Sequence, residues 1–186
     1  MRLLILVFFL APIIALGQST EDLAQQHLRN LKNGAIFIRL PTSQNKIKAY
    51  LDAGQQKKAE KTARSQQLEN IKLYLAFKSA YDFSEVYFFY NLSSKAIQSG
   101  NFKGHLLNEN LEPDPEINYA GPYYIAEFDV IQTTGLSALV IKDSNFNLLQ
   151  KPFPYYAKLY NFFPLIKKNN LQVVIDLNKG LHSNLK

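Results

Sequence analysis

The spacing of apolar and polar side chains changes its period several times along the chain, and a two-residue period marks the strands. Apolar residues alternate in GAIFIRLP, residues 34–41, whose β-branched content predicts an interior strand. EVYFFYN, residues 85–91, carries aromatic side chains on both faces, which predicts a central strand covered on both sides. YYIAEFDVI, residues 123–131, also alternates, and LSALVIK, DSN and FNLLQK, residues 136–151, predict a hairpin.

Spacings of three and four residues predict helices in the segments that precede and follow the first strand. Residues 18–33 begin with a capping-box pattern and predict a short helix that ends near Gly34. Thr42 or Ser43 would cap a second short helix, which Gly54 would stop. Residues 55–82 predict a long helix, with a polar first half that lies on the surface.

The second half of this long helix is apolar over most of its circumference. Leu68, Ile71 and Leu75 lie on one side, and other apolar side chains cover most of the rest. This pattern predicts that other elements enclose the helix. Further along, i,i+4 aromatic pairs predict a short helix over residues 155–163, and the tail from residue 170 favours a helix over an edge strand.

These elements predict a single α/β domain over residues 18–186, with a central mixed sheet and helices packed on it. The helical crossover between the strands at 34–40 and 85–91 favours a parallel, right-handed βαβ unit. Antiparallel strands and a C-terminal helix complete the domain. The long connection over residues 92–122 is expected to be partly held down by its apolar side chains Phe102, Leu106, Leu107 and Leu111.

The order of a strand, a long helix, an aromatic-rich strand, a strand pair and a terminal helix resembles the thioredoxin-like fold. LVIKDSNFNLL, residues 139–149, is similar to the hairpin of secreted members of that group, and Pro122 stands where the group has a cis-proline. The resemblance covers residues 34–184 and concerns arrangement, because the Cys-x-x-Cys motif is missing. It implies a fold and transfers no redox function.

The N-terminal sequence MRLLILVFFLAPIIALGQST predicts export. One cation, Arg2, precedes an apolar run that ends at Leu16, and small residues follow at the expected cleavage position. We expect a signal peptide over residues 1–17, cleaved after Gly17, and a secreted or periplasmic mature chain. The apolar run is too short to span a membrane comfortably, so no membrane span is expected after signal removal.

Composition narrows the chemistry of the mature chain. The sequence has no cysteine, which excludes disulfides, a thiolate nucleophile, thiolate-bound metals and a redox dithiol. Beyond the signal peptide, 20 Lys and Arg stand against 15 Asp and Glu, a net charge of +5. The lysines are distributed along the whole chain without a basic stripe, and no nucleic-acid-binding motif is present, so a nucleic-acid partner is not expected.

The segment KPFPYYAKLYNFFPLIKK, residues 151–168, is the first candidate for ligand binding. Its aromatic side chains could form the lid of the core, with the lysines directed into water. Alternatively, they could form an exposed platform that stacks on sugar rings or a peptide while a lysine reaches an anionic group. The residues of this platform would be Tyr155, Tyr156, Tyr160 and Lys158.

Glu127 and Asp129 are the best candidates for carboxylate chemistry. At positions i and i+2 of a strand they point to the same side, which suits shared metal coordination or acid and base roles. The alternative is a solvated strand face. The acidic loop over residues 108–116 offers oxygen ligands, but its spacing does not follow the calcium-binding loop pattern. No nucleotide-binding motif is present, and we predict no cofactor.

The sequence therefore favours an exported, non-redox binding or interaction domain with a protein or glycan partner that the sequence does not identify. It leaves open whether the protein is an enzyme, although the lack of a recognisable catalytic motif favours a binding role. The alternative function is a metal-assisted hydrolase that uses the strand or loop carboxylates. A third hypothesis is an assembly module of thioredoxin-like arrangement without catalysis.

Overall fold

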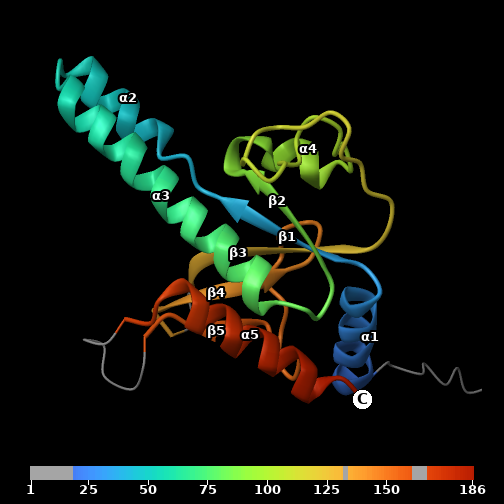
Figure 1. Ribbon diagram of the computed structural model, residues 1–186. Helices are drawn as coiled ribbons and strands as arrows, with labels where there is room; N and C mark the ends of the chain where they lie inside the picture. The colour runs from blue at the N-terminus through green and yellow to red at the C-terminus, as the bar shows by residue number, and fades with distance from the viewer. Residues whose placement is uncertain (1–18, 132–133, 161–166) are drawn as a thin grey trace, which may run out of the picture.

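The computed structural model describes residues 19–131, 134–160 and 167–186, and the predicted signal peptide lies outside this part of the chain. At the centre of the described residues is a mixed sheet of five strands in the order β2-β1-β3-β4-β5 (Figure 1). The strands are Ala35–Leu40 (β1), Glu85–Tyr90 (β2), Tyr123–Ile131 (β3), Leu136–Lys142 (β4) and Tyr156–Lys158 (β5). The predicted α/β class with a mixed sheet is confirmed.

Strand β1 pairs in parallel with both β2 and β3, while β4 pairs antiparallel with β3 and β5. The predicted parallel pairing across the long helix is therefore confirmed, and β1 is interior as expected. The prediction that β2 is a central strand is wrong, because β3 takes the other side of β1 and leaves β2 at the edge. The aromatic side chains of β2 are nevertheless covered on both faces, with Phe88 and Phe89 buried on opposite sides.

The three longest helices of the described residues pack on one face of the sheet. The helices are Thr20–Lys32 (α1), Gln44–Asp52 (α2), Gln56–Ala80 (α3), Ser94–Gln98 (α4) and Asn170–Asn184 (α5), and a 3₁₀ turn, Asn91–Ser93, precedes α4. Helices α1, α3 and α5 share one apolar core with one face of the sheet, where Leu28, Phe77 and Val174 cluster with Ile38 and Ala126. The expected helical tail is confirmed as α5.

The opposite face of the sheet is covered by the long connection between β2 and β3. Ile97, Phe102 and Leu106 of this connection cluster with Phe37 of β1 and Ile125 of β3. All five side chains are buried, so the connection is held down as its apolar residues predict. The proline before β3 follows a trans peptide bond, and the cis bond in the described residues lies before Pro152 instead.

Helix α2 and the first half of α3, residues 44–67, form an arm that extends beyond the sheet (Figure 1). The base of the arm is fixed by a line of hydrogen bonds: Ser43 donates to Gln66 over 2.6 Å, Gln66 donates to Asn70 over 3.1 Å, and Asn70 donates to the carbonyl of Pro41 over 2.9 Å. Ser43 directly precedes α2 in a left-handed conformation and its side chain makes no capping bond, so its predicted role as a side-chain cap is wrong. Its hydroxyl is used to hold α3.

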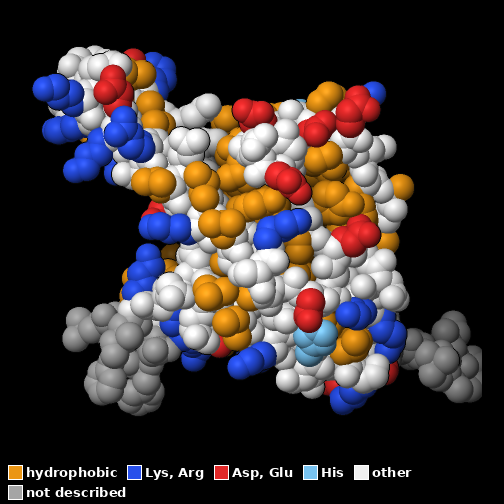
Figure 2. All heavy atoms as spheres, in the orientation of Figure 1, with side chains coloured by type: hydrophobic (Ala, Val, Ile, Leu, Met, Phe, Trp, Pro, Cys, Tyr) orange, Lys and Arg blue, Asp and Glu red, His pale blue; other side chains and the backbone are white. Residues whose placement is uncertain are grey.

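Charge gathers on this arm to a degree that the sequence reading did not expect. Residues 44–67 hold six Lys and Arg and two Asp and Glu, a net charge of +4 out of +5 for the chain beyond residue 17. In Figure 2 the blue side chains crowd the arm, while red and blue are mixed over the rest of the visible face. The lysines are spread along the chain as expected, with 12 of 17 outside residues 44–67, but the net positive charge is concentrated on the arm.

Two further predictions about local structure need correction. Residues 146–151 form a single bridge, between Lys142 and Leu148, rather than a strand, so β4 finds its antiparallel partners in β3 and β5. The second half of α3 is not enclosed, because it packs on the sheet and on α5 through one side only. Its opposite side remains exposed at Leu68, Ile71 and Leu75.

Within the described residues, no helix is both long enough and apolar enough to cross a membrane.

Gly34 lies at the junction of α1 and β1, and a substitution there tests how closely the backbone before β3 packs against this junction. A Cβ atom there would lie 2.1 Å from the carbonyl oxygen of Pro122 and 2.7 Å from that of Asn30. We predict that Gly34→Ala lowers the free energy of unfolding by about 2 kcal/mol or more, because backbone atoms must move apart. Gly180→Ala in α5 is the matched control and should raise it by about 0.5–1 kcal/mol, since its Cβ meets only Pro154 at 3.7 Å. Urea unfolding of residues 18–186 measures both, and equal effects would contradict the assignment.

Candidate functional site

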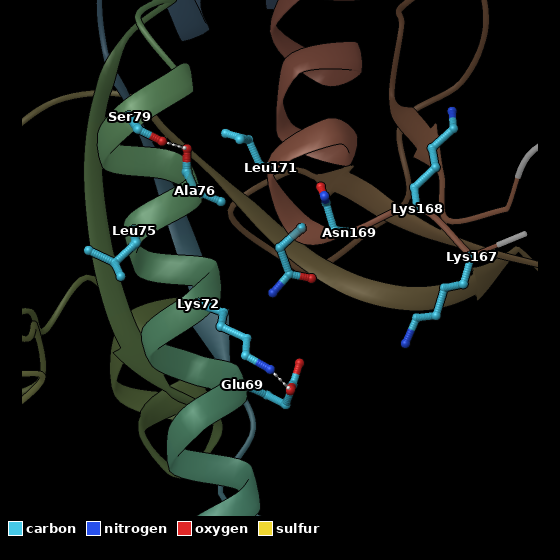
Figure 3. Close-up of a pocket in the computed structure, with 10 residues that line it drawn as sticks. Glu69, Lys72, Leu75, Ala76, Ser79, Lys167, Lys168, Asn169 and Leu171 are labelled. Atoms are coloured by element: carbon cyan, nitrogen blue, oxygen red, sulfur yellow. Dashed lines mark hydrogen bonds and ion pairs between the residues drawn. The ribbon is translucent and has the colours of Figure 1, made fainter.

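An open groove with a volume of about 500 Å³ lies between the second half of α3 and the beginning of α5 (Figure 3). It combines apolar side chains of both helices with charged and polar side chains. Lys72 extends from α3 to Glu69 of the same helix, with which it forms an ion pair. The residues that line the groove are Glu69, Lys72, Leu75, Ala76 and Ser79 of α3, Lys167, Lys168 and Asn169 before α5, and Asn170 and Leu171 of α5.

Local interactions at the start of α5 fix the second wall of the groove. The side chain of Asn169 accepts a hydrogen bond of 2.8 Å from the backbone N–H of Gln172, which caps the helix. The ammonium group of Lys168 lies 2.6 Å from the carboxylate of Asp176 and ties the preceding segment to the helix. Helix α5 packs against α3 below the groove, where Val173 and Leu177 are buried.

The groove has a small net positive charge. Three lysines and a single acid, Glu69, line it. Lys72 lies 2.7 Å from Glu69, and Lys168 is neutralised by Asp176 outside the groove. Lys167 is absent from the ion pairs of the described residues. The net positive charge of the groove therefore favours a partner with an anionic group.

Exposed apolar side chains border the groove on both sides. Leu75 of α3 is 57% exposed and Leu171 of α5 is 44% exposed. A smaller cavity of about 230 Å³ shares Glu69, Lys167 and Asn170 with the groove and continues it toward Phe128 of β3, which is also exposed. Large apolar side chains gathered around a hollow commonly mark an interaction site.

Tyr155, Tyr156, Lys158 and Tyr160 do not line the groove, although Lys167 and Lys168 at the end of the same segment, residues 151–168, do. Residues 156–158 form strand β5 instead of the predicted helix, because Tyr156 and Ala157 pair with the otherwise free edge of β4. Spacings of four residues fit a strand face as well as a helix face, so the aromatic pairs did not distinguish the two structures. The part of the predicted helix at residues 161–163 lies outside the described residues.

Within this segment Tyr155 and Tyr156 both pack against a small buried cluster of β3 and β4, formed by Ile131, Ala138 and Val140. Tyr155 packs against the core, and its ring centroid lies 4.8 Å from that of Tyr156. Tyr156 and Lys158 lie on the same face of β5, with Tyr156 half-buried and Lys158 exposed. Tyr160 is half-buried and forms a backbone bridge with Lys167. A ligand site that uses all four residues stays a prediction, and this arrangement favours the core-lid interpretation for Tyr155.

Glu127 and Asp129 of β3 do lie on the same side, as predicted, but both already bind cations. Glu127 is buried and forms ion pairs with Arg39 of β1 and, over 2.7 Å, with Lys142 of β4. Lys142 also lies 2.7 Å from Asp129. Arg39 donates a further hydrogen bond of 2.9 Å to Ser94, so the cluster connects three strands with the connection that covers them.

The opposite charges in this cluster stabilise the ionised forms of Asp129 and Lys142. The hydrogen bond from Lys142 holds the pKa of Asp129 below its usual value of 3.8, even though burial opposes this. Burial by itself would lower the pKa of Lys142, but its bonds to Asp129 and Glu127 outweigh this and raise the pKa above 10.5. Asp129 is consequently a poor proton acceptor, which weakens the acid–base hypothesis. A metal at these carboxylates stays a prediction, and it would have to displace Arg39 or Lys142.

Other titratable groups are likewise used in local structure. His27 lies 2.8 Å from the hydroxyl of Tyr124, and its burial lowers its pKa. In the acidic loop, Asn108 and Asp114 accept backbone N–H groups of their own turns. Among the described residues, no group of three or more His, Asp or Glu side chains is arranged to hold a metal ion.

Comparison with known proteins adds no identification: no family model, no curated protein and no solved structure matches this chain. The thioredoxin-like resemblance therefore stays a prediction about arrangement. The groove itself was missed by sequence reasoning, because its walls come from segments about a hundred residues apart. The available signal was the apolar line of Leu68, Ile71 and Leu75, in excess of what the core needs.

A pair of isosteric substitutions tests the structural role of the carboxylate cluster. We predict that Glu127→Gln lowers the free energy of unfolding by about 2 kcal/mol, because two cations lose their buried partner. Asp129→Asn should lower it by less than about 1 kcal/mol, since that side chain is nearly half exposed. The effect of Asp129→Asn should vanish as the pH falls through the lowered pKa of Asp129, where the wild-type carboxylate also loses its charge. Urea unfolding at pH 7 and pH 3 measures these differences, and a larger effect of Asp129→Asn would contradict the cluster.

Proposed function

We propose that this chain is an exported, non-redox interaction domain that binds a protein partner in the groove between α3 and α5. The observation that carries the proposal is that exposed Leu75 and Leu171 border this open groove, which has a net positive charge. Covering these two half-exposed side chains would contribute roughly 1 kcal/mol each to binding. The lysines at the edges would select a partner with acidic side chains.

A protein partner has more support than the other hypotheses. The tyrosines proposed to stack on a glycan are half-buried, and Tyr155 and Tyr156 pack against buried residues of β3 and β4. A metal-assisted hydrolase has less support, because Glu127 and Asp129 already bind Arg39 or Lys142. The sequence contains no cysteine, so thiol chemistry has no basis. The thioredoxin-like arrangement enters this proposal as a fold hypothesis without catalysis.

Export is the part of the proposal that rests on the sequence alone. The apolar N-terminal run and the small residues around Gly17 support a cleaved signal peptide. We expect the protein isolated from the secreted or periplasmic fraction of its native cell to begin at Gln18. Intact-mass measurement tests this, and a chain that retains residues 1–17 in the cytosol would contradict export without bearing on the groove.

The groove is tested with peptides selected from a random phage-displayed library on residues 18–186. We expect selected peptides to contain apolar anchors and acidic residues, and their affinity to fall about tenfold or more with Leu75→Ser. Leu92→Ser is the matched control, because Leu92 is equally exposed, at 59%, and lies outside the groove. Fluorescence polarisation measures the affinities. Peptides that bind both variants equally well would contradict the groove as the binding site.

A further inference from the structure

The long helix α3 carries a second ordered surface on the side that faces away from the core. Six exposed residues recur along it at alternating intervals of four and three positions, which places them on one line of the helix. The core-facing side chains Ala59, Asn70, Leu73 and Phe77 lie on the opposite side. We call this line the α3 seam; its residues are Lys57, Lys61, Arg64, Leu68, Ile71 and Leu75.

We infer that the α3 seam is a docking surface for an amphipathic helix of a partner protein, apolar over one half of its contact line and acidic over the other. This inference deepens the proposed function and rests on its claim that the chain binds a protein partner; Leu75 belongs to both the seam and the groove. Alternating intervals of four and three residues are the spacing by which one helix packs along another.

The half of the seam nearer the body of the protein is apolar. Leu68 is 52% exposed, Ile71 is 38% exposed and Leu75 is 57% exposed. Three successive seam positions with large aliphatic side chains exceed what a solvent-facing helix needs, and Leu171 of α5 adds to the same exposed region beside the groove. These side chains would supply most of the affinity for a partner helix.

The half of the seam on the arm is cationic. Lys57, Lys61 and Arg64 occupy its three positions, and none of them takes part in an ion pair among the described residues. Covering three such charges with apolar side chains would be unfavourable, so the facing positions of a partner must be acidic. Pairs of this kind add little affinity but fix the direction and register of the partner.

The order of charges along the seam excludes a second copy of this chain as its occupant. Two seams side by side in parallel would bring six cations together, and in antiparallel they would place cations against leucines. A membrane surface fits less well than a helix. The cationic and apolar halves are separated lengthwise over about 27 Å, whereas helices that lie in a membrane carry both kinds of residue along their whole length.

The inference is tested with two synthetic helical peptides of about 20 residues. Each has Glu at three successive contact positions and Leu at the next three, and the two peptides differ in which half comes first. A control peptide has Lys in place of Glu. We expect one of the acidic peptides to bind residues 18–186 in a calorimetric titration and the control peptide to bind at least about tenfold more weakly.

Charge reversal on the protein identifies the surface. The triple variant Lys57→Glu, Lys61→Glu and Arg64→Glu should weaken binding of the acidic peptide by about tenfold or more. A second triple variant makes the same change of net charge at exposed lysines elsewhere and should bind like the wild type: Lys95→Glu, Lys103→Glu and Lys151→Glu. Raising NaCl from about 0.1 M to about 1 M shortens the Debye length from about 10 Å to about 3 Å and should reduce the difference between the two variants.

Three outcomes would overturn the inference: neither acidic peptide binds, both triple variants weaken binding equally, or the chain binds anionic lipid vesicles and not the peptides. The proposed function fails separately. If phage-selected peptides lose affinity with Leu75→Ser while the designed acidic peptides do not bind, the groove stands and the seam is wrong. If the designed peptides bind and discriminate the triple variants while Leu75→Ser has no effect on selected peptides, the seam stands without the groove.

Discussion

The parallel pairing of β1 with a strand on each side is the constraint on which the rest of the molecule depends. A parallel neighbour requires a long crossover, and both faces of β1 must then be covered. Helix α3 provides the crossover to β2, and the connection after β2 provides the second cover. With 25 residues α3 is about 37 Å long, while the six residues of β1 span about 20 Å. The helix therefore overhangs the sheet, and α2 folds back along the part that overhangs.

The spacing of apolar residues predicted those strands and helices that keep one face toward the core along their whole length. The strict alternation of β1 and β3 and the helical spacing of α1 and α3 were sufficient. The spacing also predicted β2 as a strand but not its place at the edge of the sheet, because strand order is set by contacts between distant segments. It failed for β5, which was predicted as a helix. The tyrosine spacing of residues 155–163 fits both periods, and only the free edge of β4 makes residues 156–158 a strand.

The sequence identified the residues that could carry chemistry by their type, but it did not predict which side chains would surround them. Glu127 and Asp129 point to the same side as predicted, but their cationic partners come from β1 and β4, which no local pattern could place. The positive charge of residues 44–67 was visible as composition. Its concentration on a projecting arm became evident only when α2 and the first half of α3 were seen to lie beyond the sheet. In both cases the sequence contained the charges and the fold decided what they face.

The sequence pattern and the structure disagree over how far the second half of α3 is buried, and this difference has a physical meaning. Its apolar circumference predicts burial on all sides, and the chain covers the side of Leu73 and Phe77 while Leu68, Ile71 and Leu75 face water. Each exposed aliphatic side chain forgoes roughly 1–2 kcal/mol that burial would contribute, and the fold tolerates this because one side of the helix already anchors it to the sheet and to α5. Three such side chains in register with three cations on the same helical line are more order than solubility requires. We therefore regard the pattern as one half of a helix pair whose other half belongs to a different chain.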